Sequence, residues 1–191
     1  MTRIQVNIPE GRVGEWSVKK FMGDHTTIYS QALGQPVNRI HSENDNELYG
    51  EYTFLIHDVY GPIMQDTASE YHEHEPLWTG ATGDVLIAGL GIGFVNQKLI
   101  DNPNVTSVTI VEKNQDVIDL VWQHCPKNQS FTLVHADIET WVPPQGSHWN
   151  YAWFDSWCGD NQMNLESYRQ FITNRYQPYC DQIGVWSNIL S

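Results

Sequence analysis

Apolar residues in the second half of the chain gather in short runs that polar turns separate. The run over residues 85–88 is apolar without alternation, which is typical of a strand covered on both faces in a parallel sheet. Further strands are expected over residues 105–111, 131–134, 151–154 and 182–186. Apolar residues at helical spacing predict helices over residues 94–100, 116–124 and 164–176. This alternation predicts an α/β fold with about five parallel strands.

The N-terminal part follows a different pattern. Ile4, Val6 and Ile8 alternate with polar residues, which is typical of a strand with one buried face. The polar segment 41–50 is expected to connect later strands. The segments expected to form strands here are residues 2–8, 18–22 and 51–60.

A helix is expected to begin near Ala68, because Thr67 and Glu70 fit a capping box. Pro76 should kink or end this helix, since proline lacks the N–H that a helix interior requires. We therefore expect two parts: a small β-rich segment over residues 1–64 and a Rossmann-like α/β domain over residues 65–191.

A glycine-rich turn follows the strand expected over residues 85–88. Gly89, Gly91 and Gly93 stand at every second position, so the backbone can turn tightly and approach a ligand closely. A dinucleotide-binding G-x-G-x-x-G motif would need glycine at position 94, which is Phe94. The G-x-G-x-G spacing indicates a nucleotide-like cofactor, and an ordinary turn from strand to helix is the alternative.

Acidic residues end the next three predicted strands. Glu112 lies 19 residues after Gly93, where a carboxylate of a doubly wound sheet can accept the ribose hydroxyls of a nucleoside. Asp137 follows the third strand and could equally cap the segment 138–141. Asp155 follows the fourth strand, and ligands bind at the carboxyl ends of such strands. We expect Asp155 at the reactive centre.

Two histidines, His72 and His74, raise the question of a metal site. Metal-binding pairs on a helix usually lie four residues apart on one face, whereas residues two apart diverge. We therefore expect no metal. The polar residues Gln65, Thr67 and Tyr71 suggest instead that this segment covers the cofactor.

Charge narrows the choice of substrates. The formal net charge is −13, and residues 51–191 hold 17 acidic and 5 basic side chains. Such a surface repels phosphate backbones, so we expect no nucleic-acid partner and favour a neutral or cationic small molecule. Solubility alone would also explain the charge.

Cys125, Cys158 and Cys180 are an odd set without close spacing, which indicates neither a disulfide framework nor a zinc site. There is no apolar run long enough to span a bilayer and no signal segment at Met1. We expect a cytoplasmic protein without a membrane partner.

Together, the glycine turn and the strand-end acids resemble the class I S-adenosylmethionine-dependent methyltransferase superfamily over residues 65–187. Within it the chain is most similar to the spermidine synthase type, which also has an apolar residue two positions before the first glycine, here Ile87. That type carries Gln-x-Thr followed by Tyr-x-Glu before the turn, and the matching residues are Gln65, Thr67, Tyr71 and Glu73. The chain also resembles small bacteriophage methyltransferase-like proteins, through its Asp66-Thr67, glycine-turn and Asp155-x-Trp157 segments.

The resemblance implies S-adenosylmethionine as the cofactor, with ribose binding by Glu112 and an adenine contact by Asp137. The residues expected to contact the cofactor are Gln65, Gly89, Leu90, Gly91, Gly93, Glu112, Lys113, Asp137, Ile138, Asp155, Ser156 and Trp157.

For catalysis, the resemblance implies that Asp155 accepts the proton of the nucleophile, with His72 or His135 as less favoured bases. Tyr71 and Trp157 would form an aromatic wall, because aromatic faces attract a sulfonium cation. The expected catalytic residues are Asp155, Tyr71 and His72.

Two departures weaken a role in spermidine synthesis: Ile92 and Cys158 stand where those enzymes have aspartates. DNA adenine methylation is disfavoured as well. Its Asn/Asp-Pro-Pro-aromatic signature would stand at residues 155–158, whereas the only Pro-Pro pair, 143–144, precedes the fourth strand. We expect methyl transfer to a small molecule. The alternatives are aminopropyl transfer, another cleavage of the sulfonium, or a binding protein that has lost the reaction.

The chain stops five residues after the fifth expected strand. Either the N-terminal strands or a second copy would then cover the edge of the sheet, and we favour a homodimer.

Overall fold

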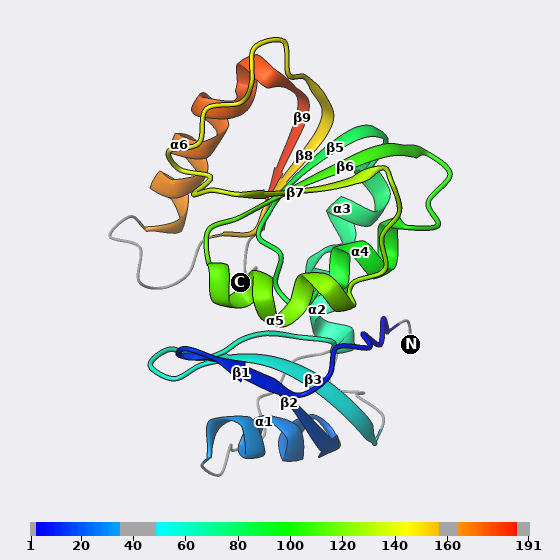
Figure 1. Cartoon of the computed structure of the whole chain (residues 1–191), viewed down its shortest axis with the longest axis vertical. Coiled ribbons are helices and arrows are strands. Elements are labelled where there is room, and N and C mark those ends of the chain that lie inside the picture. Colours follow the sequence, from blue (N-terminus) through cyan, green and yellow to red (C-terminus); the bar gives the residue numbers. More distant parts are fainter. Residues whose placement is uncertain (1–2, 35–48, 157–163, 187–191) are drawn as a thin grey trace. The chain divides into compact units, whose positions relative to one another are not determined.

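The computed structural model describes residues 3–34, 49–156 and 164–186. The chain forms two compact units. Unit 1 comprises Met1–His72, Gly91–Gln97 and Asp116–Pro126, and unit 2 comprises Glu73–Leu90, Lys98–Gln115 and Lys127–Ser191. Each unit contains one sheet (Figure 1). The boundary expected between residues 64 and 65 stays a prediction.

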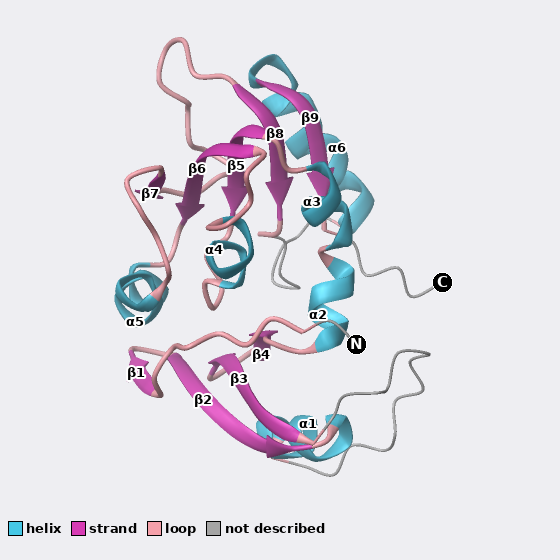
Figure 2. Cartoon of the chain, turned by 90° about the vertical axis from the view of Figure 1, so that its right-hand side faces the viewer, coloured by secondary structure: helices cyan, strands magenta, loops and turns pink. Residues whose placement is uncertain are grey.

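The sheet of unit 2 has five strands, all parallel, in the order β7-β6-β5-β8-β9. The strands are β5 (Gly83–Ala88), β6 (Val105–Glu112), β7 (Phe131–His135), β8 (Trp149–Phe154) and β9 (Cys180–Val185). The prediction of a parallel α/β sheet is confirmed. The chain runs outward from β5 to β7 and then returns to β8, so the strand order reverses between β5 and β8 (Figure 2).

Both faces of this sheet are covered. Leu86 and Phe154 pack with α6 (Leu165–Tyr176). On the opposite face, the Tyr151 hydroxyl donates to the carbonyl of Pro76 in α3 (Glu75–Gly80) at 3.0 Å. Figure 1 shows α6 and α3 on opposite sides of the strands. This double coverage explains the continuous apolar run of β5.

The remaining helices follow the sequence pattern with small shifts. They are α2 (Ala68–Glu73), α4 (Phe94–Leu99), α5 (Gln115–Val121) and the 3₁₀ turns Trp122–His124 and Gln177–Tyr179. The expected capping contact is present, because the Glu70 N–H donates to Thr67 Oγ1 at 3.2 Å. Helix α2 ends at Glu73, before Pro76, as expected. Pro76 then lies in the first turn of α3, where a missing N–H costs no helical hydrogen bond.

Unit 1 contains an antiparallel sheet in the order β1-β2-β3-β4. Its strands are β1 (Gly11–Val13), β2 (Trp16–Gly23), β3 (Gly50–His57) and β4 (Gly61–Gln65). Helix α1 (His25–Leu33) packs on it through Ile28, which is buried with Tyr52, Phe54 and Ile56. The strands expected over residues 18–22 and 51–60 are confirmed as β2 and β3, although β3 ends at His57.

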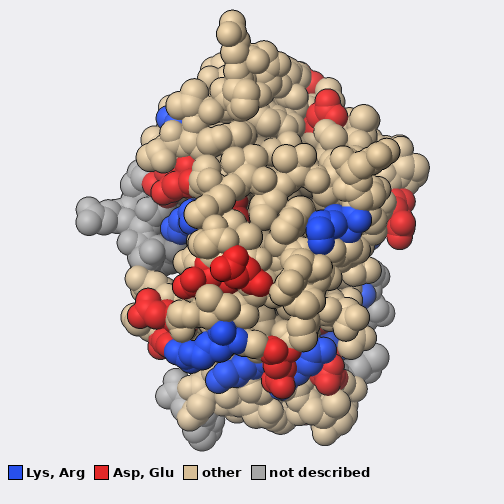
Figure 3. Space-filling view, in the orientation of Figure 1, with Lys and Arg blue, Asp and Glu red and all other residues tan. Residues whose placement is uncertain are grey.

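Opposite charges are interspersed on one face of the chain. On the face drawn in Figure 3, Lys and Arg side chains of the described residues lie among Asp and Glu side chains. Arg12 pairs with Asp58 and Lys20 pairs with Glu51 in unit 1. Within the described residues, no helix has the length and apolar character needed to cross a membrane.

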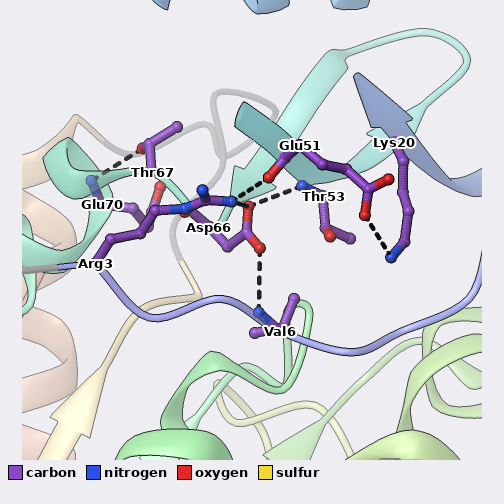
Figure 4. Close-up of polar contacts among 8 residues, drawn as sticks. All are labelled: Arg3, Val6, Lys20, Glu51, Thr53, Asp66, Thr67 and Glu70. Atoms are coloured by element: carbon purple, nitrogen blue, oxygen red, sulfur yellow. Dashed lines mark hydrogen bonds and ion pairs between the residues drawn. The ribbon is translucent and has the colours of Figure 1, made fainter. Parts of the chain in front are cut away.

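The strand expected over residues 2–8 is wrong for its described part. Residues 3–10 are not in a strand, although Val6 and Ile8 are buried and Gln5 and Asn7 are exposed, as the alternation predicted. The physical reason is a side chain: the Val6 N–H donates to Asp66 Oδ2 at 3.1 Å instead of to a neighbouring strand (Figure 4). Most of the expected connector 41–50 lies outside the described residues.

Candidate functional site

The glycine turn begins directly after β5. Gly89, Gly91 and Gly93 all have positive φ, at 102°, 53° and 70°. At Gly89 a Cβ atom would lie 2.6 Å from the backbone oxygen of Asp155, a distance that a side chain does not tolerate. Glycine is therefore required at position 89 both by its φ and by the end of β8 beside it.

Glu112, the last residue of β6, is tied to the same turn. Its Oε2 accepts from the Leu90 N–H at 2.9 Å, and its Oε1 accepts from the Asn114 N–H at 2.8 Å. Burial raises the pKa of Glu112, and the two backbone hydrogen bonds partly offset that rise. Each carboxylate oxygen can accept a second hydrogen bond, which is the capacity that hydroxyl groups of a nucleoside would use.

The residues after β7 have structural roles in unit 2. Asp137 is exposed, and its Oδ1 accepts from the Glu139 N–H at 2.9 Å, so its carboxylate caps the following turn. Ile138 is buried in the core against α6, and its carbonyl accepts from the Tyr176 hydroxyl at 2.7 Å. His135 Nε2 lies 3.1 Å from the carbonyl oxygen of Lys113.

Asp155 follows β8, next to the glycine turn. Its backbone N–H donates to the carbonyl of Ala88 at 3.0 Å. Its Oδ2 lies 2.9 Å from Nε2 of His74, a residue that the sequence did not single out as catalytic. The Asp155 side chain is 25% exposed, whereas that of His74 is 0% exposed. Asp155 is thus the accessible member of the pair.

Ser156 also lies in this part of unit 2. Its hydroxyl is hydrogen-bonded to the Tyr168 hydroxyl, and burial raises the pKa of that phenol. Tyr168 itself belongs to α6 and is buried in the core. Ser156 is therefore held by the core, directly after the candidate reactive residue.

The predicted residues fall into two sets. At the carboxyl ends of β5 to β8 in unit 2 are Gly89, Leu90, Glu112, Lys113, Asp137, Ile138, Asp155 and Ser156. The arrowheads of β5, β6 and β8 point to one edge of the sheet (Figure 2). Unit 1 contains Gln65, Tyr71, His72, Gly91 and Gly93. Trp157 and Cys158 lie outside the described residues.

The unit 1 residues make local contacts. The Gln65 side chain donates to Glu70, and the rings of Tyr71 and His72 meet edge to face with centroids 5.7 Å apart. These contacts are compatible with structural roles as well as with binding roles, so the assignment of Gln65, Tyr71 and His72 to the site stays a prediction.

No protein-family model matches the chain, and no curated protein matches it. Three solved structures that it resembles are named as methyltransferases. N-methyltransferase NodS from Bradyrhizobium japonicum WM9 is 14% identical, with 44% of this chain and 48% of NodS covered, at a TM-score of 0.36. CalO1, a methyltransferase in calicheamicin biosynthesis in its SAH-bound form, is 17% identical, with 60% of this chain and 34% of CalO1 covered, at a TM-score of 0.42. A putative methyltransferase from Thermoplasma acidophilum is 17% identical, with 53% of this chain and 45% of that protein covered, at a TM-score of 0.38.

The matched part spans less than half the length of each of these three proteins. Because all three TM-scores lie below 0.5, the fold assignment depends on strand order and connections within this chain. On that evidence the chain is an α/β protein with a Rossmann-like parallel sheet and a small antiparallel N-terminal sheet.

Proposed function

We propose that this protein is an S-adenosylmethionine-dependent methyltransferase that acts on a small neutral or cationic molecule. One observation carries the proposal: the ends of β6 and β8 both contact the glycine turn after β5. Glu112 accepts the Leu90 N–H, and the Asp155 carbonyl lies against Gly89. In doubly wound sheets this switch point is where ligands bind, at the carboxyl ends of the strands.

The residues present fit the proposed cofactor. A buried carboxylate, already oriented by two backbone N–H groups, is suited to the paired hydroxyls of a ribose. Exposed Asp137 is suited to an amino group on adenine. We propose that Gly89, Leu90, Glu112 and Asp137 hold the nucleoside, with the remaining predicted residues around them.

When bound, S-adenosylmethionine supplies an electrophilic methyl group on a sulfonium, which needs little further activation. The work left to the chain is to orient the acceptor and to exclude water. We propose that the Asp155 carboxylate takes the proton that the acceptor loses. The negative charge of this part of the chain favours a neutral or cationic acceptor over a phosphate-rich one.

The test begins with calorimetric titration of S-adenosylmethionine, S-adenosylhomocysteine, methylthioadenosine and NAD into the purified protein. We expect the first two to bind and NAD not to bind. Glu112→Gln should weaken S-adenosylmethionine binding by about 10-fold to 100-fold, because it removes the charge and one acceptor. Glu166→Gln is the matched control, since Glu166 is 83% exposed and pairs only loosely with Arg169, at 3.8 Å.

Turnover is then measured by mass spectrometry with a panel of small amines, alcohols, phenols and thiols. S-Adenosylhomocysteine formed in the presence of an acceptor supports methyl transfer. Methylthioadenosine would favour aminopropyl transfer or another cleavage of the sulfonium. Binding without any product would favour a protein that has lost the reaction, and no binding at all would refute the proposal.

A further inference from the structure

We propose that His74 is a positioning residue for Asp155: its ring holds one carboxylate oxygen, Oδ2, and thereby directs the other, Oδ1, to the proton of the acceptor. This inference rests on the proposed function, because it assigns His74 a part in the same proton transfer. The sequence had placed His72, not His74, among the catalytic residues.

The exposures decide which member of the pair meets the substrate. His74 Nε2 lies 2.9 Å from Asp155 Oδ2, a normal hydrogen-bond distance. The His74 side chain is 0% exposed and that of Asp155 is 25% exposed. A buried ring cannot reach an acceptor that enters from solvent. His74 therefore acts through Asp155 and does not replace it as the base.

The His74 ring is held in place by aromatic neighbours in unit 2. It stacks on Trp78 with centroids 5.6 Å apart and planes inclined by 20°, and it lies 5.8 Å from the ring of Trp153. Trp153 precedes Asp155 by two residues in β8. The strand that leads directly into Asp155 therefore also supports the ring that orients it.

The backbone of His74 is fixed as well. Its carbonyl oxygen accepts from the N–H groups of Leu77 and Trp78, at 2.9 and 3.1 Å, at the start of α3. Asp155 is fixed on its side by its hydrogen bond to Ala88. Backbone hydrogen bonds thus fix both members of the pair, and fixed orientation of a reacting group lowers a barrier.

The protons balance as follows. A neutral His74 that carries its proton on Nε2 donates it to the ionised Asp155. As the acceptor forms its bond to the methyl carbon, the methyl–sulfur bond breaks and its electron pair stays on sulfur. The proton of the acceptor passes to Asp155 Oδ1. His74 keeps its proton throughout.

Three variants separate positioning from packing. His74→Phe keeps a ring between the two tryptophans but loses the donor, and His74→Gln retains an N–H donor. The matched control is His148→Phe, because His148 forms a pair with Asp181 at 3.1 Å that is more than half exposed on both sides. Thermal melting of each variant shows whether it is folded.

Kinetics use the acceptor found in the panel above. We expect His74→Phe to lower kcat by about 10-fold to 100-fold, the size of effect that misplacing a reacting group produces. His74→Gln should recover most of kcat, and the Kd of S-adenosylmethionine should stay unchanged in all variants. A folded His74→Phe protein with normal kcat overturns the inference, as does turnover that EDTA abolishes and Zn²⁺ restores, which would make the pair metal ligands.

A second measurement requires no turnover. In ¹⁵N-histidine NMR spectra of the whole protein, we expect His74 as the Nε2–H tautomer, with a signal that moves on Asp155→Ala but not on Asp181→Ala. The opposite tautomer, or no response to Asp155→Ala, overturns the inference. Failure of the proposed function is distinct, because it is seen as absence of S-adenosylmethionine binding by the unaltered protein.

Discussion

Glu112 holds the glycine turn through a hydrogen bond that no apolar residue could replace. Glu112 is 9% exposed, and its carboxylate accepts the N–H of Leu90. The cost of this arrangement is desolvation, which raises the pKa of Glu112 above its ordinary value of 4.5. The same residue is therefore both a candidate ligand for the cofactor and a site where stability depends on pH.

The direction of that dependence follows from linkage. Because the folded state binds the Glu112 proton more tightly than the unfolded state, the stabilisation is present below pH 4.5 and is lost as pH rises through the folded-state value. We expect the free energy of unfolding of the wild type, minus that of Glu112→Gln, to fall as the pH rises above 4.5, by about 1.4 kcal/mol for each unit by which folding raises the pKa. Urea unfolding in acid and at neutral pH measures this difference. A difference that grows with pH would show that the pKa is lowered instead.

At the scale of single residues, the sequence identifies some candidate residues and misses others. Gly89, Glu112 and Asp155 could be singled out because each stands at the carboxyl end of a strand in a parallel sheet, where ligands bind. His74 had no such signal. Its contact with Asp155 joins residues 81 positions apart, and no local spacing reports a contact of that kind.

Among the secondary-structure elements, the parallel strands were the easiest to predict, because strands covered on both faces read as continuous apolar runs. The elements of unit 1 were harder. Helix α1 has an Asp24 cap that accepts the Thr27 N–H at 2.9 Å and a left-handed Gly34 at its end, yet it begins with weak helix formers. Strand β4 contains Pro62, which disfavours a strand from sequence alone.

The N-terminal segment shows how one side chain can override an alternating pattern. Asp66 accepts the N–H groups of Val6 and Thr53, at 3.1 and 2.7 Å, and pairs with Arg3 (Figure 4). The Arg3 guanidinium also lies 3.7 Å from the centre of the Tyr52 ring. A carboxylate thus links residues 3–8 to β3, where alternation alone predicts a strand partner.

We expect Asp66→Ala to lower the free energy of unfolding by about 3–5 kcal/mol, because it leaves the partly buried Arg3 guanidinium and two buried N–H groups without their acceptor. Asp58→Ala is the matched control. Asp58 is 40% exposed in its pair with Arg12, so its loss should cost less than about 1 kcal/mol. Urea unfolding compares the two variants. Equal effects would show that Asp66 contributes no more than a surface ion pair.

At the scale of the whole molecule, both sheets have edge strands that another chain could pair with. In the described residues, β7 and β9 form the edges of the parallel sheet, and β1 and β4 form those of the antiparallel sheet. Exposed edges offer unpaired N–H and carbonyl groups to another chain. We therefore propose a homodimer, as the sequence led us to expect.

Light scattering tests this proposal. A dimer should show twice the 22.0 kDa mass of one chain, and dilution should move the mass toward that of a single chain. A mass of 22.0 kDa at every concentration would contradict it.

The contacts between Asp66 and residues 3–6 have a consequence for how this segment detaches. A strand in a ladder frays one hydrogen bond at a time from its end, whereas a segment held at a few points, here Asp66 and the carbonyl of Glu51, is attached or released as one unit. Burial raises the pKa of Asp66, so the attached segment binds the Asp66 proton more tightly than the released segment does. Proteolysis within residues 3–10 should therefore be slower in mild acid than at neutral pH, and cleavage should follow release of the segment as one unit.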